Sequence, residues 1–498
     1  MPKPRFLLKE PKSKKKVAQA PRTVDEFLAV GVEQEEAGEK WRAGDAAKSL
    51  RFFMRAVTTY DEGLQRYPNA FDLAYNKARV QYEITQHPKL ASQLSTPLAE
   101  VLQVALHSHR EALRLEQDNA DALFNTAQVL TSLAEVVTDT KRPLEEQLNQ
   151  AVRFLQEAVE LFQRCLVLQE LRYTEMQEDI RQMESGEFGQ PEQMEQMQDV
   201  QEELDDTDSK EPGQEQWAAV VEPVTKDTLV DTAVAQLDAL ATICNLLTYG
   251  PCAGLNWVEE YSTELLQEKI TAYVEGSSRH YEAALARAKF NAALNEILYR
   301  CERIDVETFY SAVTGSFGTD LNISADPEGL CAKADALVSF NTATTEQPPY
   351  HDKEALAKSL GYKWQALSTA VDALTRASKL PDAENLPKIH LARGDTEMSR
   401  WRLGFSPWEY GMAQQYGATL LRNAQTFYRG AVALARRDAA ADIERDGTCK
   451  EAIAAAIEGQ KEKLAQLKGS APKELLAVAE DIVEDGWVSG SDMEALLS

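Results

Sequence analysis

Residues 68–78 read PNAFDLAYNKA and residues 118–127 read DNADALFNTA, and the second stretch repeats the pattern of the first. Each opens with turn-forming residues, contains the dipeptide Asn-Ala and runs through apolar residues to an alanine. A pattern that returns along one chain indicates an internal repeat, and repeated helical units build their core by stacking on one another. These stretches therefore point to a repeat architecture.

A second pattern recurs more widely: a small residue, a bulky residue four positions later, and an alanine three positions after that. These steps place the three side chains on one stripe of a helix, where the small ones let an antiparallel neighbour approach closely. Six triplets occur: Ser49, Phe53, Ala56; Ala105, His109, Ala112; Ala151, Leu155, Ala158; Ser277, Tyr281, Ala284; Ala370, Leu374, Ala377; and Ala424, Tyr428, Ala431. Ala, Leu, Glu, Gln and Arg dominate from about residue 25, and no convincing strand pair appears, so an all-α chain is predicted.

The residues around the triplets resemble tetratricopeptide repeats (TPR). Gly44-Asp45 is similar to the turn inside such a repeat, residues 68–78 and 118–127 to the junction between repeats, and Leu380-Pro381 to part of a junction. The resemblance covers roughly residues 30–172 and, more faintly, 228–440, and it implies a right-handed superhelix of antiparallel helix pairs, a TPR-like α-solenoid. Ala56 to Ala112 is 56 residues and Ala112 to Ala158 is 46, so the repeats are longer than the family's period of about 34.

Composition divides the chain into five segments. Residues 1–24 are expected to be a disordered basic tail, and residues 25–173 the N-terminal repeats. Residues 174–227 hold 17 acidic and three basic residues, which predicts a flexible acidic insertion whose first part extends the preceding helix. Residues 228–468 are expected to be C-terminal repeats, and 469–498 an acidic tail whose short helix either docks on the chain or is read by a partner.

The charge of the chain limits its partners. Lys plus Arg number 53 and Asp plus Glu number 80, a net charge of −27. Such a chain repels phosphates, so direct nucleic-acid binding is not expected, whereas a basic protein partner is compatible. The sequence contains no run of about 18 apolar residues, so no membrane-spanning helix is expected. The six cysteines are dispersed without a C-x-x-C pair, which favours reduced, mostly buried thiols.

The sequence offers no recognisable catalytic site. No histidine pair has the H-x-x-x-H spacing of a metal site, and no phosphate-binding loop, dinucleotide fingerprint or nucleophile elbow occurs. His109 occupies the bulky position of its triplet, so we expect a packed core histidine rather than a ligand. We therefore predict a chain that is not an enzyme and that needs neither a metal nor a cofactor.

The resemblance places partner binding on the first helix of each repeat. If Ala78 and Ala127 mark the small position of that helix, seven residues would line the groove: Tyr75, Asn76, Arg79, Tyr82, Phe124, Asn125 and Gln128. The asparagines could hold a peptide backbone through paired contacts, or could simply brace neighbouring helices. Binding of the C-terminal tails of the chaperones Hsp70 and Hsp90 is not expected. The carboxylate clamp of the family would need Lys and Asn where this chain has Gln34 and Gly38, and cations near Gln128 and Leu130.

The N-terminal tail suggests where the chain acts. Its lysines, Lys12, Lys14, Lys15 and Lys16, lie beside a proline, and such a cluster is typical of a nuclear localisation signal or of a merely solubilising tail. We therefore expect a cytoplasmic and nuclear chain. Two functions remain open: an adaptor or dedicated chaperone shielding a basic client, possibly ribosomal or nuclear, and a structural scaffold subunit of a multiprotein complex.

Overall fold

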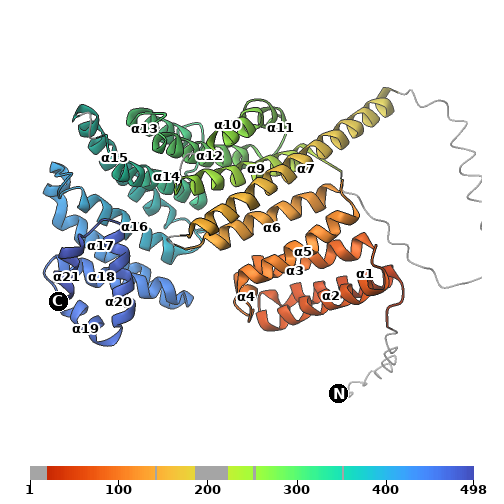
Figure 1. Cartoon of the computed structure of the whole chain (residues 1–498), viewed down its shortest axis with the longest axis horizontal. Coiled ribbons are helices and arrows are strands. Elements are labelled where there is room, and N and C mark those ends of the chain that lie inside the picture. The colour runs from red at the N-terminus through yellow and green to blue at the C-terminus, as the bar shows by residue number, and fades with distance from the viewer. Residues whose placement is uncertain (1–19, 141–142, 186–222, 251–253, 350–352) are drawn as a thin grey trace, which may run out of the picture. The chain divides into compact units, whose positions relative to one another are not determined.

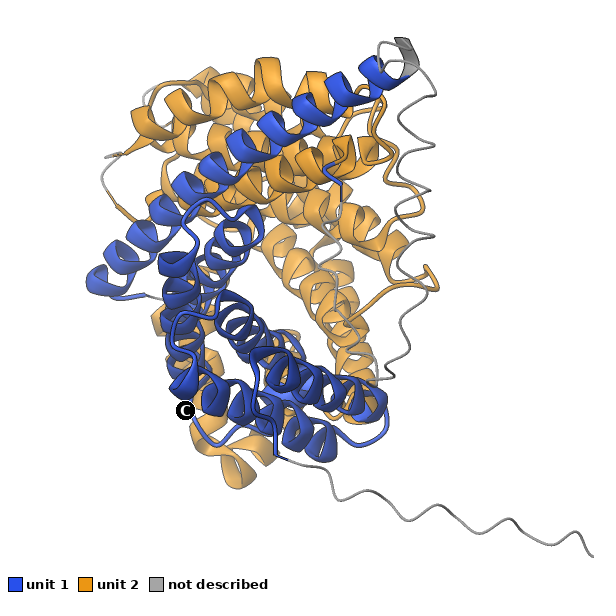
Figure 2. Cartoon of the chain, turned by 90° about the vertical axis from the view of Figure 1, so that its right-hand side faces the viewer, with its two compact units in different colours: residues 1–224 blue, residues 225–498 orange. Residues whose placement is uncertain are grey.

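The computed structural model describes residues 20–140, 143–185, 223–250, 254–349 and 353–498, and within these ranges every regular element is a helix (Figure 1). The all-α prediction is therefore confirmed for the described residues. The chain forms two compact units, residues 1–224 and 225–498, which Figure 2 colours blue and orange. Each is described by itself below.

The first unit is a series of helix pairs. Its helices are α1 (Val24–Arg42), α2 (Ala46–Arg66), α3 (Phe71–Gln86), the short α4 (Pro88–Ala91), α5 (Leu98–Leu115), α6 (Ala120–Thr138) and α7 (Glu145–Ser185). The turn residues singled out in the sequence start helices, because Asp45 accepts a hydrogen bond from the Lys48 amide at 2.9 Å and Asn119 one from the Ala122 amide at 3.1 Å.

Consecutive helices pack antiparallel through small residues. A Cβ atom on Gly31 of α1 would lie 2.2 Å from the Tyr60 ring, and one on Gly38 would lie 3.0 Å from the Phe53 ring of the same neighbour, α2. The contacts pair a higher residue number on α1 with a lower residue number on α2, so the two helices run in opposite directions. Ser49 completes the contact by donating its hydroxyl to the Gly38 carbonyl at 2.7 Å.

Alternate helices run parallel, and their contacts give the length of the repeat. Tyr75 and Tyr82 of α3 each contact α6 at residues 50 further along, Asn125 and Ser132. The contacts between α1 and α3 are separated by 41 and 44 residues. The helices α1, α3 and α6, which we call the first helices of unit 1, thus stack side by side at an irregular period longer than that of a typical tetratricopeptide repeat.

The second unit repeats this arrangement. It contains α9 (Lys226–Leu247), α10 (Leu255–Glu264), the π-helical turn η1 (Leu265–Lys269), α11 (Ile270–Val274), α12 (His280–Arg300), α13 (Val306–Ser316), α14 (Pro327–Glu346), α15 (Lys353–Ala377), α16 (Leu386–Arg402), α17 (Gly411–Asp438), α18 (Ala441–Ile457), α19 (Glu462–Ser470), α20 (Pro472–Glu484) and α21 (Gly490–Leu497). The pair α16–α17 uses the same device as α1–α2, since a Cβ on Gly394 would lie 2.3 Å from the Tyr428 ring.

The repeated triplets mark buried stripes in five of six cases. The triplets on α2, α5, α7, α15 and α17 are buried at all three positions. The prediction of a buried stripe is wrong for the triplet that begins at Ser277, because Ala284 is exposed and Tyr281 is only half-buried. It lies at the start of α12, whose buried face is set by other residues, including Ala283 and Ala286.

His109 is a packed core residue, as its place in the triplet predicts. Its side chain is 1% exposed, and its ring packs edge-on against Tyr82 with centroids 6.3 Å apart. Neither ring nitrogen makes a hydrogen bond of ordinary geometry in the described part of the chain. Burial, opposed only weakly by the nearby Ala78 carbonyl, lowers the pKa of His109 to about 4.

This pKa predicts a pH-dependent stability. The unfolded chain binds a proton near pH 6.5 but the folded chain only near pH 4, so stability falls as the pH drops through that window, by about 3 kcal/mol in all. His109→Leu, which copies Leu155 of the equivalent stripe, should remove this dependence. Urea unfolding between pH 7 and pH 4 measures it, and a variant with the same slope as the parent chain would contradict the assignment.

The C-terminal segment belongs to the core of unit 2. Residues 469–498 form two helices, α20 and α21, in place of the single short helix expected. Leu475, Val478, Ile482 and Trp487 are buried in one cluster with residues of α16 to α18. The Trp487 indole donates to the Ser399 hydroxyl at 3.1 Å, so this segment docks on its own chain.

Three further expectations can be compared with the structure. α7 continues to Ser185, so the helix reaches into the predicted acidic insertion, whose residues 186–222 lie outside the described part of the chain. Free thiols are present at Cys165, Cys244, Cys331 and Cys449, but Cys301 is disulfide-bonded, which corrects the expectation of reduced thiols throughout. The helix α9 is long and apolar enough to cross a membrane, yet 67% of its apolar window is buried inside the protein, as in a core helix.

Candidate functional site: an acidic groove in the second unit

The seven residues predicted to line a groove are half-buried on α3 and α6. Several join the two helices to each other. The Asn125 amide donates to the Tyr75 hydroxyl at 2.9 Å, and the Tyr82 hydroxyl lies 2.9 Å from that of Ser132 and 3.4 Å from the Gln128 carbonyl. Phe124 packs against Phe162 of α7, with ring centroids 5.4 Å apart.

The remaining predicted residues also have partners inside the unit. The Asn76 amide donates to the Asp72 carbonyl one turn earlier, at 2.8 Å. Arg79 pairs with Glu35 of α1, which also accepts a hydrogen bond from Tyr60. Bracing of neighbouring helices, the alternative left open for the asparagines, therefore describes the contact of Asn125, whereas Asn76 bonds within its own helix. Peptide binding by these residues stays a prediction.

Charges between α1 and α3 largely neutralise one another. Arg42 contacts Glu39 at 2.7 Å and Glu83 at 3.1 Å, and Arg79 contacts Glu83 at 3.4 Å. Burial, then the neighbouring Glu39 carboxyl, raises the pKa of Glu83 to about 7. With its arginines already engaged, this network offers little to an incoming charged ligand.

Two of the positions that a chaperone-tail clamp would require face inward. Gly38 abuts the Phe53 ring, and Leu130 is fully buried. Neither position presents a side chain to a ligand. The tail lysines Lys12, Lys14, Lys15 and Lys16 lie outside the described residues.

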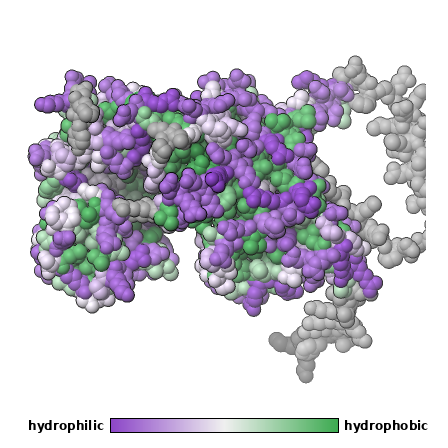
Figure 3. Space-filling view, in the orientation of Figure 1, coloured by the Kyte–Doolittle hydropathy of each residue, from purple (hydrophilic) through white to green (hydrophobic). Residues whose placement is uncertain are grey.

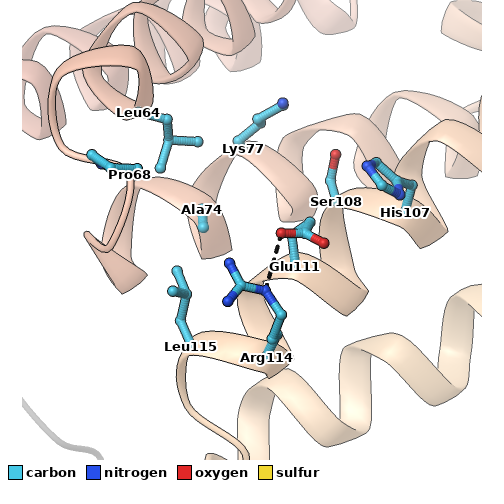
Figure 4. A pocket seen from close by; sticks show the side chains of 9 residues that line it. All are labelled: Leu64, Pro68, Ala74, Lys77, His107, Ser108, Glu111, Arg114 and Leu115. Atoms are coloured by element: carbon cyan, nitrogen blue, oxygen red, sulfur yellow. Dashed lines mark hydrogen bonds and ion pairs between the residues drawn. The ribbon is translucent and has the colours of Figure 1, made fainter.

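A small pocket of about 190 Å³ opens between α2, α3 and α5 in unit 1 (Figure 4). Its charged groups are already paired, since Arg114 lies 3.3 Å from Glu111 and Lys77 lies 2.6 Å from Asp61. In Figure 4 a dashed line joins Glu111 and Arg114, and Ser108 and His107 lie above and to the right of Glu111. The pocket is too small and too well neutralised to be the main candidate.

A larger groove of about 650 Å³ lies in unit 2, between the N-terminal parts of α14 and α16. Its apolar floor includes Leu374 and Ile389. Its charged lining, which we call the acidic groove, consists of Asp326, Glu328, Asp335, Asp382 and Glu384 together with Lys388. Five carboxylates against one lysine make it strongly negative.

Two of these carboxylates have structural roles. Asp326 caps α14 by accepting from the amides of Glu328 at 3.0 Å and Gly329 at 2.9 Å, and it also accepts from the Tyr281 hydroxyl. The Glu328 carboxylate is 2.6 Å from the amine of Lys289 on α12. These contacts explain their presence without a ligand.

The other three carboxylates have no such explanation. Within the described residues no hydrogen bond or ion pair shorter than 4.0 Å reaches the side chains of Asp335, Asp382 or Glu384. Asp335 lines the groove, and its side chain is exposed to solvent. Burial raises its pKa even though Lys388 and Lys289 act in the opposite direction. A further cation beside the Asp335 carboxyl would stabilise its charged form.

A further carboxylate of the same kind lies on α9 of this unit. Asp238 of α9 is likewise accessible but surrounded, and burial raises its pKa, opposed by Lys289 and reinforced by Glu328. The Cys331 thiol lines the groove itself, and burial together with the nearby carboxylates raises its pKa to about 11. A thiol held protonated is a poor nucleophile, so the groove is suited to binding rather than to thiol chemistry.

Metal chemistry gains no support from these residues. Within the described ranges no group of three or more His, Cys, Asp or Glu side chains converges as metal ligands would. Lys388 among the carboxylates also makes the groove better suited to an extended chain of mixed polar and basic residues than to a single ion.

The sequence reasoning missed this groove because acidic residues are everywhere in the chain. The one usable signal was Leu380-Pro381, which marks a junction between helix pairs directly before Asp382 and Glu384. Aligning that junction with the ones at residues 68 and 118 would have pointed to the start of α16.

Comparisons with known proteins add a relative of limited similarity. No family model matches the chain. A UPF0656 protein of Schizosaccharomyces pombe is 26% identical over 435 residues, covering 85% of this chain and 87% of that protein. A solved circular tandem repeat protein with novel repeat topology aligns over 92% of this chain and 98% of its own length at 14% identity and a TM-score of 0.28, a similarity from which nothing further follows.

Proposed function

We propose that this chain is a non-enzymatic, tetratricopeptide-like adaptor or dedicated chaperone that shields a basic segment of a client protein in the acidic groove of unit 2. Asp335 carries the proposal, because it is an exposed carboxylate in the lining of the groove that makes no ion pair among the described residues. Asp382 and Glu384 stand at the same opening and are equally unpaired.

A lysine or arginine side chain is the ligand that this chemistry favours. Its charged group would pair with Asp335 and lower the pKa of that carboxyl. Its methylene groups would pack on the apolar floor of the groove. Complementary charge also speeds encounter and excludes acidic competitors. The net charge of −27 acts in the same direction at longer range.

The class of client follows from charge and from the tail. Ribosomal and chromatin proteins are rich in Lys and Arg, and the lysines at positions 12, 14, 15 and 16 would allow travel between cytoplasm and nucleus with such a client. This choice rests on analogy among repeat proteins.

The groove can be tested with a defined probe. A fluorescein-labelled pool of short Lys-, Arg- and Ser-containing peptides should bind the full chain, and the triple variant Asp335→Asn, Asp382→Asn, Glu384→Gln should weaken binding about tenfold or more, the worth of about 1.4 kcal/mol. Binding by the parent chain should fall steeply between about 50 mM and about 500 mM salt, because salt screens exposed charges. Fluorescence anisotropy gives both affinities.

A matched variant separates the groove from overall charge. Glu462→Gln, Glu474→Gln, Glu480→Gln removes three exposed carboxylates from α19 and α20 of the same unit. It should bind the basic pool nearly as well as the parent chain. Equal weakening by the two triple variants would mean that only net charge matters, and the groove would lose its role.

The scaffold-subunit alternative is favoured by one observation. The C-terminal half of α7 exposes several large apolar side chains: Val167 (51%), Leu171 (56%), Ile180 (41%) and Met183 (71%). A permanent partner would cover such a helix. On the face seen in Figure 3, hydrophobic residues otherwise form separate patches among hydrophilic ones. Contacts of this kind survive high salt, whereas contacts with the acidic groove do not.

A further inference from the structure

A second cavity in unit 2 has the opposite character to the acidic groove. It measures about 800 Å³ and opens among α16, α17, α18 and α21 and the turns after α16 and α20. Its walls are mainly apolar: Trp401, Phe405, Leu421, Ile457, Trp487 and Val488. We call it the aromatic pocket.

Aromatic rings form its most prominent wall. Trp401 and Phe405 pack with ring centroids 4.5 Å apart, and Phe405 remains 48% exposed at the opening. Trp487 is fixed by its hydrogen bond to Ser399 and is 7% exposed. A rigid aromatic wall that stays open to solvent is typical of a pocket that receives a bulky apolar side chain.

Two basic side chains, Arg402 and Lys461, lie at the rim of the pocket. The Arg402 guanidinium uses its Nε to donate to the Gly486 carbonyl at 2.7 Å, which holds the group at the pocket, and it makes no other hydrogen bond or ion pair shorter than 4.0 Å among the described residues. Lys461 is exposed on the same rim, likewise without a hydrogen bond or ion pair there. Burial lowers the pKa of Arg402 although the Asp492 carboxylate acts in the opposite direction, so a further anion beside the guanidinium would be stabilising.

The single carboxylate of the pocket does not cancel these cations. Asp492 is committed to the start of α21, where it accepts from the Ser489 hydroxyl at 2.6 Å and its amide donates back to that hydroxyl at 3.1 Å. Two cations against one carboxylate leave the rim positive. The net charge of −27 opposes the approach of an acidic ligand at long range, so these local cations must supply the attraction.

We propose that the aromatic pocket binds an acidic peptide segment of a partner protein, which inserts one bulky apolar side chain between Trp401, Phe405 and Trp487 and places its carboxylates at Arg402 and Lys461. The pocket would let one unit hold two partners of opposite charge, a basic one in the acidic groove and an acidic one here. The proposal stands independently of the groove.

The test uses the full chain and a fluorescein-labelled pool of short peptides with a central Phe, Leu or Trp flanked by Asp, Glu and Ser. Saturable binding is expected by anisotropy, and Phe405→Ser should weaken it about tenfold. Lys461→Glu should weaken it about fivefold and reduce its salt dependence. A pool with Ser at the centre should bind far more weakly.

Two matched variants serve as controls. Leu476→Ser removes an apolar side chain that is 53% exposed on α20, and Lys473→Glu reverses the charge of an exposed lysine on the same helix. Neither residue lines the pocket, and both variants should bind as the parent chain does. An unchanged far-ultraviolet circular dichroism spectrum and thermal midpoint show that every variant is folded.

Several results would overturn the proposal. The acidic pool could fail to saturate, or could bind the Phe405→Ser variant as well as the parent chain. Binding that appears only after deletion of residues 186–222 would assign the pocket to that acidic segment of the chain itself. A dimer in sedimentation experiments that Phe405→Ser dissociates would assign it to a second copy.

Discussion

Gly394→Ala is expected to lower the free energy of unfolding by about 3 kcal/mol, one of the largest effects of a single methyl group in this chain. The new Cβ would lie 2.3 Å from the Tyr428 ring. That ring is 1% exposed and cannot shift easily, because its hydroxyl donates to Asp395 at 2.8 Å and Asp395 is held by the Lys450 amine at 2.9 Å. Thermal unfolding followed by circular dichroism would record the loss.

Gly361→Ala is the matched control. Gly361 lies within helix α15, and a Cβ there would meet nothing within 4 Å. Alanine is the better helix former by about 1 kcal/mol, so this variant should be as stable as the parent chain or slightly more stable. If both variants changed stability alike, close approach of α16 and α17 would not be what Gly394 provides.

Lys363→Met should stabilise the chain, and the gain should depend on pH. Lys363 is fully buried, its amine donates to the Thr345 hydroxyl at 2.8 Å, and it lies 3.9 Å from the centroid of the Trp408 ring. Burial lowers the pKa of Lys363 to about 7. Folding therefore favours the neutral amine, while the unfolded chain keeps the proton up to its ordinary pKa of 10.5.

The sign of the effect follows from these two values. Below pH 7 the folded chain carries the full cost of a buried charge, and between pH 7 and 10.5 the cost declines because the folded amine is neutral and the unfolded one increasingly so. Lys363→Met should thus gain about 5 kcal/mol at pH 6, and the part due to charge should vanish near pH 10.5. Thr345 stays satisfied, since its hydroxyl also donates to the Asn341 carbonyl at 2.6 Å.

Urea unfolding at pH 6, 8 and 10 measures this gain. Lys379→Met, which replaces an exposed lysine just after the same helix, should change stability by less than about 0.5 kcal/mol at every pH. A gain for Lys363→Met that does not depend on pH would show that Lys363 stays protonated in the folded chain.

The helix pairs could be predicted from the sequence because their packing rule is local. Steps of four and three along one helix identified the buried stripes of α2, α5, α7, α15 and α17 from the second helix of each pair. The rule failed for the triplet that begins at Ser277. The same spacing of small and bulky residues occurs there at the start of α12, where it does not mark the buried face. A pattern of small and bulky residues does not say which neighbour it meets.

Other features depend on residues that only the fold brings together. The glycines that admit Tyr60 and Tyr428, Gly31 and Gly394, lie on the opposite helix of each pair, and no spacing rule links them to their tyrosines. The acidic groove combines the junction before α16 with α14, about 50 residues earlier in the chain, a separation that the irregular period conceals. The predicted binding residues of α3 and α6 are half-buried as expected, but several use their hydrogen-bonding groups inside the unit, either between helices, as Asn125 and Tyr75 do, or within one helix, as Asn76 does.

Affinity purification from native cell extract, at low and at high salt, tests the central claim most directly. The full chain should retain a basic protein at low salt and lose it at high salt, and the triple variant Asp335→Asn, Asp382→Asn, Glu384→Gln should lose it at low salt while the Glu462, Glu474, Glu480 variant keeps it. Mass spectrometry identifies the retained proteins. A set of partners that survives high salt and binds the groove variant as well as the parent chain would contradict the shielding of a basic client.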